Sequence, residues 1–202
     1  MKKSLTLSVC LGLAASANAS IISTTGSATQ IVAPASAMPG ALTAGNAWAW
    51  NEQINASVLG MPVDMSTNPS TSNAPVAGSL STFVDSHFIH FDGLPGAIIF
   101  GTVTFATNII GVQYNDSFLD MSDVLGVGTT YPTFSPGRGF QNYSGADYLR
   151  VNANVLTFEM TAPGLPHLNQ VRVFTVATPA PGSAALLGLG GLVAVRRRRA
   201  DA

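Results

Sequence analysis

Residues 83–105 read FVDSHFIHFDGLPGAIIFGTVTF and contain two strand-like segments, Phe83–Phe91 and Ala97–Phe105, separated by a Gly/Pro turn. Both segments are rich in the aromatic and β-branched residues that are enriched in strands. Runs of this kind, bounded by glycine and proline, are typical of β-strands rather than helices. The stretch therefore predicts two successive strands of a β-domain.

Similar segments follow along the chain at roughly regular spacing, with the turn Asn152–Asn154 predicting a hairpin. They are residues 30–34, 47–51, 53–58, 109–114, 147–151, 155–161 and 171–177. Residues 65–78 and 126–145 are dense in Ser, Asn, Pro and Gly and predict long loops, and Ser122–Leu125 predicts one helical turn. The pattern predicts an all-β fold, an antiparallel β-sandwich that is jelly-roll-like.

The N-terminus has the pattern of a cleaved signal peptide. Lys2 and Lys3 precede an apolar run, and Ala17 and Ala19 form a small-x-small cleavage site that leaves Ser20 as the mature start. The single cysteine, Cys10, lies within this peptide. The mature chain is therefore expected to lack disulfides, thiolate nucleophiles and Cys-ligated metals.

The C-terminus combines an apolar run with a cluster of arginines. Residues 178–199 read TPAPGSAALLGLGGLVAVRRRR, and the 13 residues of Ser183–Val195 carry no charge. As a helix this run would span about 20 Å, which is short of a hydrocarbon core of roughly 30 Å. An arginine cluster after an apolar run acts as a stop-transfer signal. We expect a short hydrophobic sorting helix that inserts transiently in the membrane.

This tail resembles the PEP-CTERM sorting signal in a Pro-Ala-Pro variant, in which Ala180 replaces the usual Glu. The matching residues are Pro179, Ala180, Pro181, Gly182, Arg196, Arg197, Arg198 and Arg199. The resemblance implies export through the inner membrane, recognition by an exosortase-type processing enzyme, and removal of the tail. It also implies retention at the cell surface or in the extracellular matrix, as for other removable anchors.

The expected organisation is a signal peptide (1–19), a flexible segment with a short strand (20–45), a β-sandwich ectodomain (46–177) and the sorting tail (178–202). Between Ser20 and Pro181 three arginines face nine Asp and Glu residues, and no lysine is present, which leaves a net charge of −6. Nucleic acid is excluded as a partner because its phosphates require basic contacts. Calcium is compatible, since it prefers carboxylate and carbonyl oxygens.

Asp116, Asp120 and Asp123 form a candidate calcium site because they lie within eight residues of one another. Their spacing does not match an EF-hand, which needs alternating ligands, a central Gly and a terminal Glu. The alternative is that one of them, or Ser122, caps a helix while the others are solvated loop charges. No other cofactor is predicted.

The histidines and glutamates do not form a recognisable catalytic set. His87 and His90 are three apart in a strand and therefore face opposite sides, so a shared zinc site is not expected. We expect one to cap the core and the other to face solvent, whereas His90 and Asp92 share a face. Glu52 and Glu159 are in separate strands, and a glycosidase pair would need them to converge. We therefore predict no catalytic residue.

The aromatic residues supply the candidate ligand-binding residues. Trp48 and Trp50 share one strand face and could stack on a sugar, although core packing is the more common role. Tyr131, Arg138 and Tyr143 belong to the most aromatic loop, which we take as the best candidate for a recognition surface.

Residues 47–176 resemble a β-rich ectodomain often attached to PEP-CTERM tails, for which we assign no activity. The resemblance rests on the runs at 84–92, 109–112 and 122–131, on Arg138-Gly139, on Asp147 and on Val171–Val173. We expect an exported, non-enzymatic surface protein that associates with exopolysaccharide or surface proteins. The alternatives are a carbohydrate-active hydrolase on a lectin-like β-sandwich, and a passive spacer of the cell surface.

Overall fold

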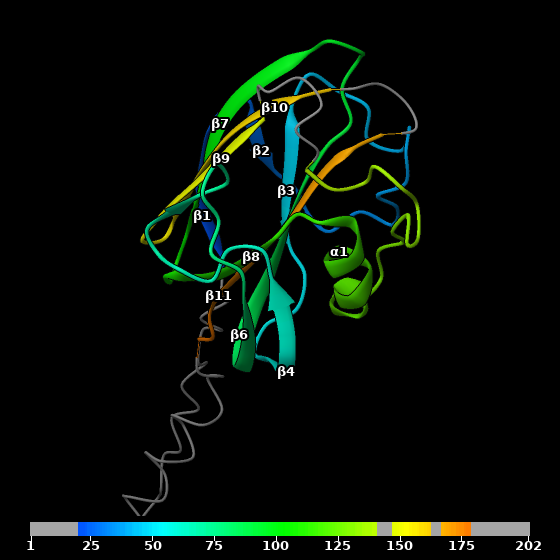
Figure 1. The fold of residues 1–202 in the computed structure, drawn as a ribbon. Helices are drawn as coiled ribbons and strands as arrows, with labels where there is room; N and C mark the ends of the chain where they lie inside the picture. The colour runs from blue at the N-terminus through cyan, green and yellow to red at the C-terminus, as the bar shows by residue number, and fades with distance from the viewer. Residues whose placement is uncertain (1–19, 141–146, 163–166, 179–202) are drawn as a thin grey trace, which may run out of the picture. The chain divides into compact units, whose positions relative to one another are not determined.

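The computed structural model describes residues 20–140, 147–162 and 167–178, which form two β-sheets and one short helical segment (Figure 1). Sheet A has the strand order β1-β7-β10-β9-β5, and sheet B has the order β2-β3-β6-β11-β8 with β4 paired to β6. Sheet A consists of β1 (Ile21–Gly26), β5 (Ser70–Thr71), β7 (Ile98–Phe105), β9 (Tyr148–Asn152) and β10 (Val155–Thr161). Sheet B consists of β2 (Ala28–Gln30), β3 (Ala47–Asn51), β4 (Ala56–Val63), β6 (Gly78–Phe91), β8 (Ile109–Gln113) and β11 (Asn169–Val176).

The main core lies between the two sheets, which makes the fold an all-β sandwich. Side chains on strands alternate between the two faces of a sheet. In β10, Leu156, Phe158 and Met160 are buried while the residues between them are partly exposed. These three pack with Ile89 and Val171 of sheet B in a single apolar cluster. The antiparallel pairing predicted from the alternation is confirmed for most of the strand pairs, with β2–β3 parallel.

The strand β6 is buried on both faces from Val84 to Phe91, because it is covered twice. One face packs in the inter-sheet core, and the other packs with Trp50, Leu119 and Tyr131 in a second apolar cluster. The second cover consists of α1 (Asp116–Ser122), the 3-10 helix η1 (Asp123–Leu125) and the loop that follows. We call residues 116–140 the cap; it covers the outer face of sheet B (Figure 1).

Several element boundaries differ from the sequence predictions. The strand expected at residues 30–34 is replaced by β1 and β2, at 21–30. As an edge strand with one exposed face, β1 can be rich in Ser and Thr, so its sequence lacks the apolar pattern of a buried strand. The helical turn expected at 122–125 is preceded by the full helix α1, for which Asn115 supplies the N-cap. The hairpin turn at Ala153–Asn154 is confirmed, between β9 and β10.

Both termini lie outside the described residues, as do 141–146 and 163–166. The expected signal peptide with Ala17 and Ala19, the sorting tail with its prolines and arginines, and Tyr143 belong to these parts. In the described ranges no helix has the length and apolar character needed to cross a membrane.

Candidate functional site

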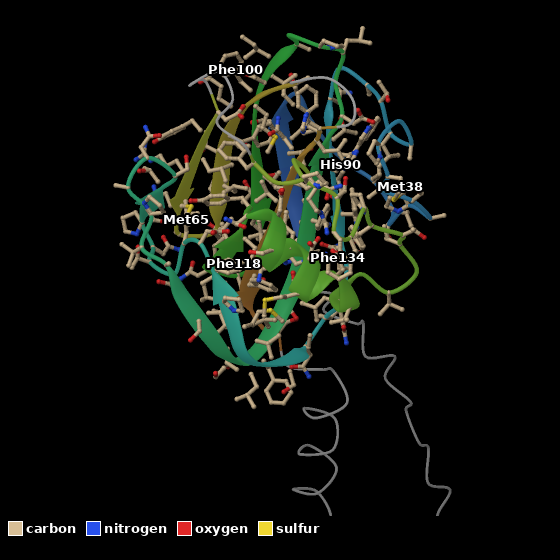
Figure 2. The ribbon with its side chains drawn as sticks, turned by 45° about the vertical axis from the view of Figure 1, so that its right-hand side comes forward. Met38, Met65, His90, Phe100, Phe118 and Phe134 are labelled. Atoms are coloured by element: carbon tan, nitrogen blue, oxygen red, sulfur yellow. The ribbon has the colours of Figure 1, made fainter. Side chains whose placement is uncertain are left out.

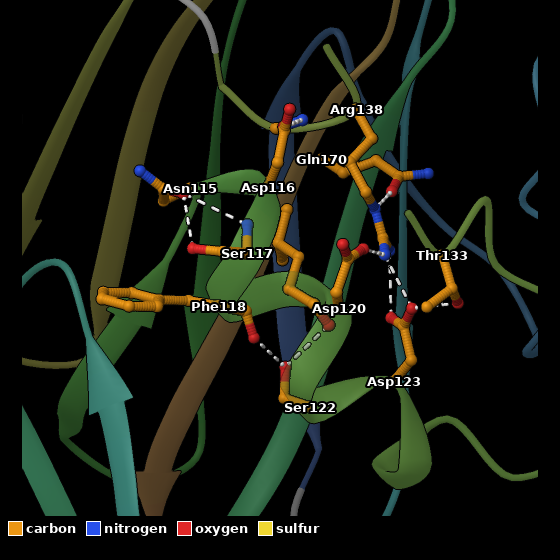
Figure 3. A network of polar contacts seen from close by, with 12 residues as sticks. Asn115, Asp116, Ser117, Phe118, Asp120, Ser122, Asp123, Thr133, Arg138 and Gln170 are labelled. Atoms are coloured by element: carbon orange, nitrogen blue, oxygen red, sulfur yellow. Dashed lines mark hydrogen bonds and ion pairs between the residues drawn. The ribbon is translucent and has the colours of Figure 1, made fainter. Parts of the chain in front are cut away.

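The cap is held on sheet B by a buried arginine of its own loop, Arg138 (Figure 3). Its Nη1 lies 2.7 Å from Asp120 Oδ1 and 2.6 Å from Asp123 Oδ2, and its Nη2 donates to Asp123 Oδ1 at 3.0 Å. Its Nε donates to Gln170 Oε1 of β11 at 2.9 Å. One guanidinium therefore joins the α1–η1 segment, the loop and the sheet through charge-assisted hydrogen bonds.

A second buried arginine, Arg172 of β11, forms a bidentate ion pair with Glu52. Its Nε and Nη2 donate to the two Glu52 carboxylate oxygens, each at 2.8 Å, and both side chains are inaccessible to solvent. Tyr131 of the cap and Ser86 of β6 donate to the same carboxylate, at 2.5 Å and 2.6 Å. Arg172 Nη1 also donates to Leu119 O and to Ser122 Oγ of α1.

The Glu52 carboxylate is ionised although it is fully buried. Burial opposes its ionisation, but the Arg172 charge and the hydrogen bonds from Arg172, Ser86 and Tyr131 hold its pKa below the ordinary value. Each oxygen accepts two hydrogen bonds, which satisfies the charge inside the protein. The arrangement therefore serves to fix the cap, and its charged groups are directed at one another rather than at solvent.

The three aspartates predicted to bind calcium are in contact with protein donors. Asp120 and Asp123 pair with Arg138, and Asp123 also accepts from Thr133 Oγ1 at 2.6 Å. The two oxygens of Asp116 accept from the backbone N–H groups of Gly137 and Gly139, each at 2.7 Å. Among the described residues no group of three or more His, Cys, Asp and Glu side chains is arranged to hold a metal ion. Calcium binding at these aspartates stays a prediction.

The two histidines of β6 do face opposite sides, as predicted, but the expectation that one is exposed to solvent is wrong. His87 packs against Phe105 in the inter-sheet core, while His90 lies on the cap side near Trp50. Both are buried, because the cap covers the face that the sequence left to solvent. Burial lowers the pKa of His87 to about 4, although the Glu52 charge opposes this; burial and the Arg138 charge lower the pKa of His90 to about 3.

The hydrogen bonds give the two imidazoles different protonated nitrogens. His87 Nδ1 lies 2.8 Å from Asn51 Oδ1, which is an acceptor, so Nδ1 carries the proton. His90 Nδ1 lies 3.0 Å from the Gln170 amide nitrogen, which is a donor, so the proton is on Nε2. Asp92, which the sequence placed on the His90 face, instead accepts from Gly40 N and Thr43 Oγ1.

The predicted ligand-binding aromatics lie mainly inside the protein. Trp50 is fully buried against Phe88, and Tyr131 is buried beside Arg172. Trp48 is half-buried and donates its indole N–H to Leu42 O. Together with the burial of Arg138, this places the predicted recognition residues that the structure describes in the support of the cap rather than on an open surface.

An exposed hollow of about 340 Å³ lies instead on the outer face of sheet A. Strand register places Phe100 of β7, Glu159 of β10 and Tyr148 of β9 side by side on that face. Phe100 is 58% exposed, and Figure 2 shows it at the margin of the molecule, whereas His90 is well inside. The hollow thus has a carboxylate with one aromatic ring on each side of it.

A row of threonines completes this hollow. Thr157 of β10 pairs with Thr102 of β7, which pairs with Thr25 of β1. The hydroxyls of Thr25 and Thr102 are 2.6 Å apart. Arg150 of β9 is opposite Thr157 in register and is exposed. The surface therefore offers hydroxyl donors and acceptors, one anionic acceptor and two rings, a combination that suits a polar ligand with flat apolar faces. We call Thr25, Phe100, Thr102, Tyr148, Thr157 and Glu159 the sheet A site.

Sequence reasoning missed this site because its residues come from four strands. Only Glu159 was singled out, as one of two glutamates with no known neighbour. The available signal was the alternation within residues 98–105 and 155–161, which puts Phe100, Thr102, Thr157 and Glu159 on the faces opposite the core residues. A comparison of the chain with protein-family models, with curated proteins and with solved structures gives no match.

Proposed function

We propose that this chain is an exported, non-enzymatic surface protein that binds exopolysaccharide through the sheet A site. The proposal retains the sequence-based expectations of a signal peptide, a jelly-roll-like sandwich and a PEP-CTERM-like tail that an exosortase-type enzyme removes. After tail processing the domain would stay at the cell surface or in the extracellular matrix, where polysaccharide is the abundant polymer.

The observation that carries this proposal is the pairing of Phe100 and Tyr148 across Glu159 on a sheet face where Phe100 is exposed. The C–H face of a sugar ring packs on aromatic rings, and its hydroxyls need donors and acceptors of the kind that the threonines and Glu159 provide. A volume near 340 Å³ is at the lower end of ordinary ligand sites, which suits one or two sugar units of a longer chain.

A carbohydrate-active hydrolase on the same scaffold is the alternative. Hydrolysis of a glycosidic bond ordinarily uses two carboxyl groups on either side of the bond. Of the described residues that line the hollow, Glu159 is the one carboxylate. Asp147 is close enough to Glu159 to be affected by its charge. Burial and the Glu159 charge raise the pKa of Asp147 to about 6, although the hydrogen bond from Thr161 N–H opposes the increase. Asp147 Oδ1 accepts from Thr161 N–H at 2.6 Å, and Asp147 is not among the described residues that line the hollow, which favours binding over hydrolysis.

Replacing Phe100 or Tyr148 with Ala should weaken binding of the producing cell's own extracellular polysaccharide by about tenfold or more, equivalent to roughly 1.4 kcal/mol. Each substitution removes a ring without touching the core. Co-sedimentation of the mature chain with that polysaccharide, in calcium and in chelator, measures the effect and also tests the calcium prediction.

Phe83→Ala is the matched control, because Phe83 is 56% exposed and lies on β6, away from this site. Glu159→Gln, which keeps shape but removes charge, separates hydrogen bonding from electrostatic attraction. Equal retention of the Phe100→Ala, Phe83→Ala and unmodified chains would contradict the assignment to sheet A. Release of shorter sugar chains that Glu159→Gln abolishes would favour the hydrolase.

A further inference from the structure

The strand β4 and the first half of β6 form a ribbon with a bulge at its exposed end. Residues pair from Ala56–Val84 to Val58–Thr82, and the register shifts before the pair Met61–Leu80. Leu59 and Gly60 occupy the shift, where Gly60 has a φ of 63°. A bulge bends and twists a strand. Figure 1 shows this ribbon at one end of the two-sheet domain, together with the end of β11.

Two large apolar side chains project from the exposed face of this ribbon. Leu59 is 91% exposed and Phe83 is 56% exposed. Phe83 pairs with Ser57, and Leu59 follows Ser57 by two residues, so Leu59 and Phe83 share a face. The opposite face carries the buried Ala56 and Val58. We call Leu59 and Phe83 the apical patch.

The ribbon around the apical patch is almost free of charge. Between Gln53 and Val84 the one charged residue is Asp64. Its carboxylate accepts from Tyr114 N at 2.7 Å and Asn115 N at 2.9 Å, directly before the cap. An uncharged surface with exposed Leu and Phe fits the boundary between lipid headgroups and acyl chains, where no desolvated charge would have to be buried.

Thr178, the last described residue, lies beside this patch. Val176 of β11 pairs with Val84 of β6, and Thr178 N donates to Asp85 Oδ2 at 2.8 Å. Asp85 is two residues from Phe83 on the same face of β6. The four residues 179–182 separate Thr178 from the apolar run that begins at Ser183. At about 3.4 Å per residue, the five steps from Thr178 to Ser183 reach at most roughly 17 Å, so an inserted tail holds the patch close to the lipid.

We propose that the apical patch inserts into the lipid surface while the tail anchors the chain, so that Leu59 and Phe83 form a second membrane contact. This inference rests on the membrane insertion of the tail in the proposed function, and it is independent of polysaccharide binding. The contact orients the domain with the ribbon toward the bilayer. It also places residues 179–182, which include the Pro-Ala-Pro sequence, at the membrane surface where a membrane-bound processing enzyme would act.

Spin labels on the full-length chain test the proposal in phosphatidylcholine liposomes. Single cysteines replace Leu59, Phe83, Leu94 and Leu187 in a Cys10→Ser background, which removes the one native cysteine. Leu94 is the matched control, since it is a leucine with 72% exposure beyond the other end of β6. Leu187 reports on the tail. The measured quantity is the accessibility of each label to oxygen, which concentrates in lipid, relative to a water-soluble nickel chelate.

The expected result is a several-fold higher oxygen-to-nickel ratio at the Leu59→Cys and Phe83→Cys positions than at Leu94→Cys, with the highest ratio at Leu187→Cys. A lipid signal at Leu187→Cys with equal, aqueous values at the other three positions would overturn the apical contact and leave the tail anchor intact. An aqueous value at Leu187→Cys would overturn both. Dipolar broadening confined to Leu59→Cys and Phe83→Cys would show that a second copy of the chain, and not lipid, covers the patch.

Discussion

Replacing Arg172 with Ala should lower the free energy of unfolding by about 3–5 kcal/mol, because it leaves the Glu52 carboxylate buried without its counter-charge. The change also removes the donors to Leu119 O and Ser122 Oγ, which attach α1 to sheet B. At about 2–4 °C per kcal/mol for a chain of this size, the melting temperature should fall by roughly 6–20 °C. Thermal and urea unfolding monitored by circular dichroism measure both quantities.

The matched control is Arg150→Ala, which removes an exposed arginine from β9 and should leave stability within about 0.5 kcal/mol. A Glu52→Leu, Arg172→Met double variant removes both charges and should cost less than the two single variants added together. A loss below about 1 kcal/mol for Arg172→Ala would mean that water reaches Glu52 and that the cap is not closed.

Acidification from pH 7 to 5 should destabilise the domain strongly through His87 and His90, whose pKa values burial lowers to about 4 and about 3. Below pH 6.5 the histidines of the unfolded chain bind protons that those of the folded chain do not. The free energy of unfolding therefore decreases as the pH is lowered, until the pH reaches the pKa values of the folded chain. At pH 5, 1.5 units below the unfolded value, the loss is roughly 2 kcal/mol for each histidine, at about 1.4 kcal/mol per unit. Asp147 acts in the opposite direction: its raised pKa of about 6 offsets roughly 1.4 kcal/mol of this loss at pH 5.

Two variants test which residues cause this loss of stability at low pH. His90→Asn keeps an acceptor for the Gln170 amide but cannot take a proton, so its urea midpoint should depend less steeply on pH between 6.5 and 5. Asp147→Asn removes the group that offsets the loss, so its dependence should be steeper. If the unmodified chain and His90→Asn show the same slope, His90 is protonated in the folded state and the cap must open to solvent.

The ionic network and the sheet A site are on opposite outer faces of the sandwich, and they differ in what their charges do. Arg138 and Arg172 form buried ion pairs that fix the cap. Glu159 and Arg150 belong to strands whose opposite face packs in the core. Their backbone is therefore held rigidly while their side chains remain accessible to a partner. Binding residues on strands are held more precisely than residues on loops, which suits a surface that repeats contacts along a polymer.

The strands could be predicted from the sequence, whereas the exposure of individual aromatic residues could not. The strands at 47–51, 98–105 and 155–161 were predictable because apolar side chains alternate there with polar or small ones. The recognition residues were not, because an aromatic residue has the same local pattern whether a distant segment covers it or leaves it open. Trp50 is buried by the cap and Tyr131 between the cap and sheet B, whereas Phe100 is exposed because nothing in the described residues covers sheet A from outside.

Composition and periodicity by themselves determined the all-β class, the acidic and lysine-free character of residues 20–181, and the opposite orientation of His87 and His90, because each depends only on local sequence. Only the tertiary structure decided which carboxylates are paired, which aromatic side chains are exposed, and that Thr178 lies beside the apical patch. Those features depend on contacts such as Arg172–Glu52, between residues 120 positions apart, and no local pattern specifies which of several acidic residues such an arginine will meet.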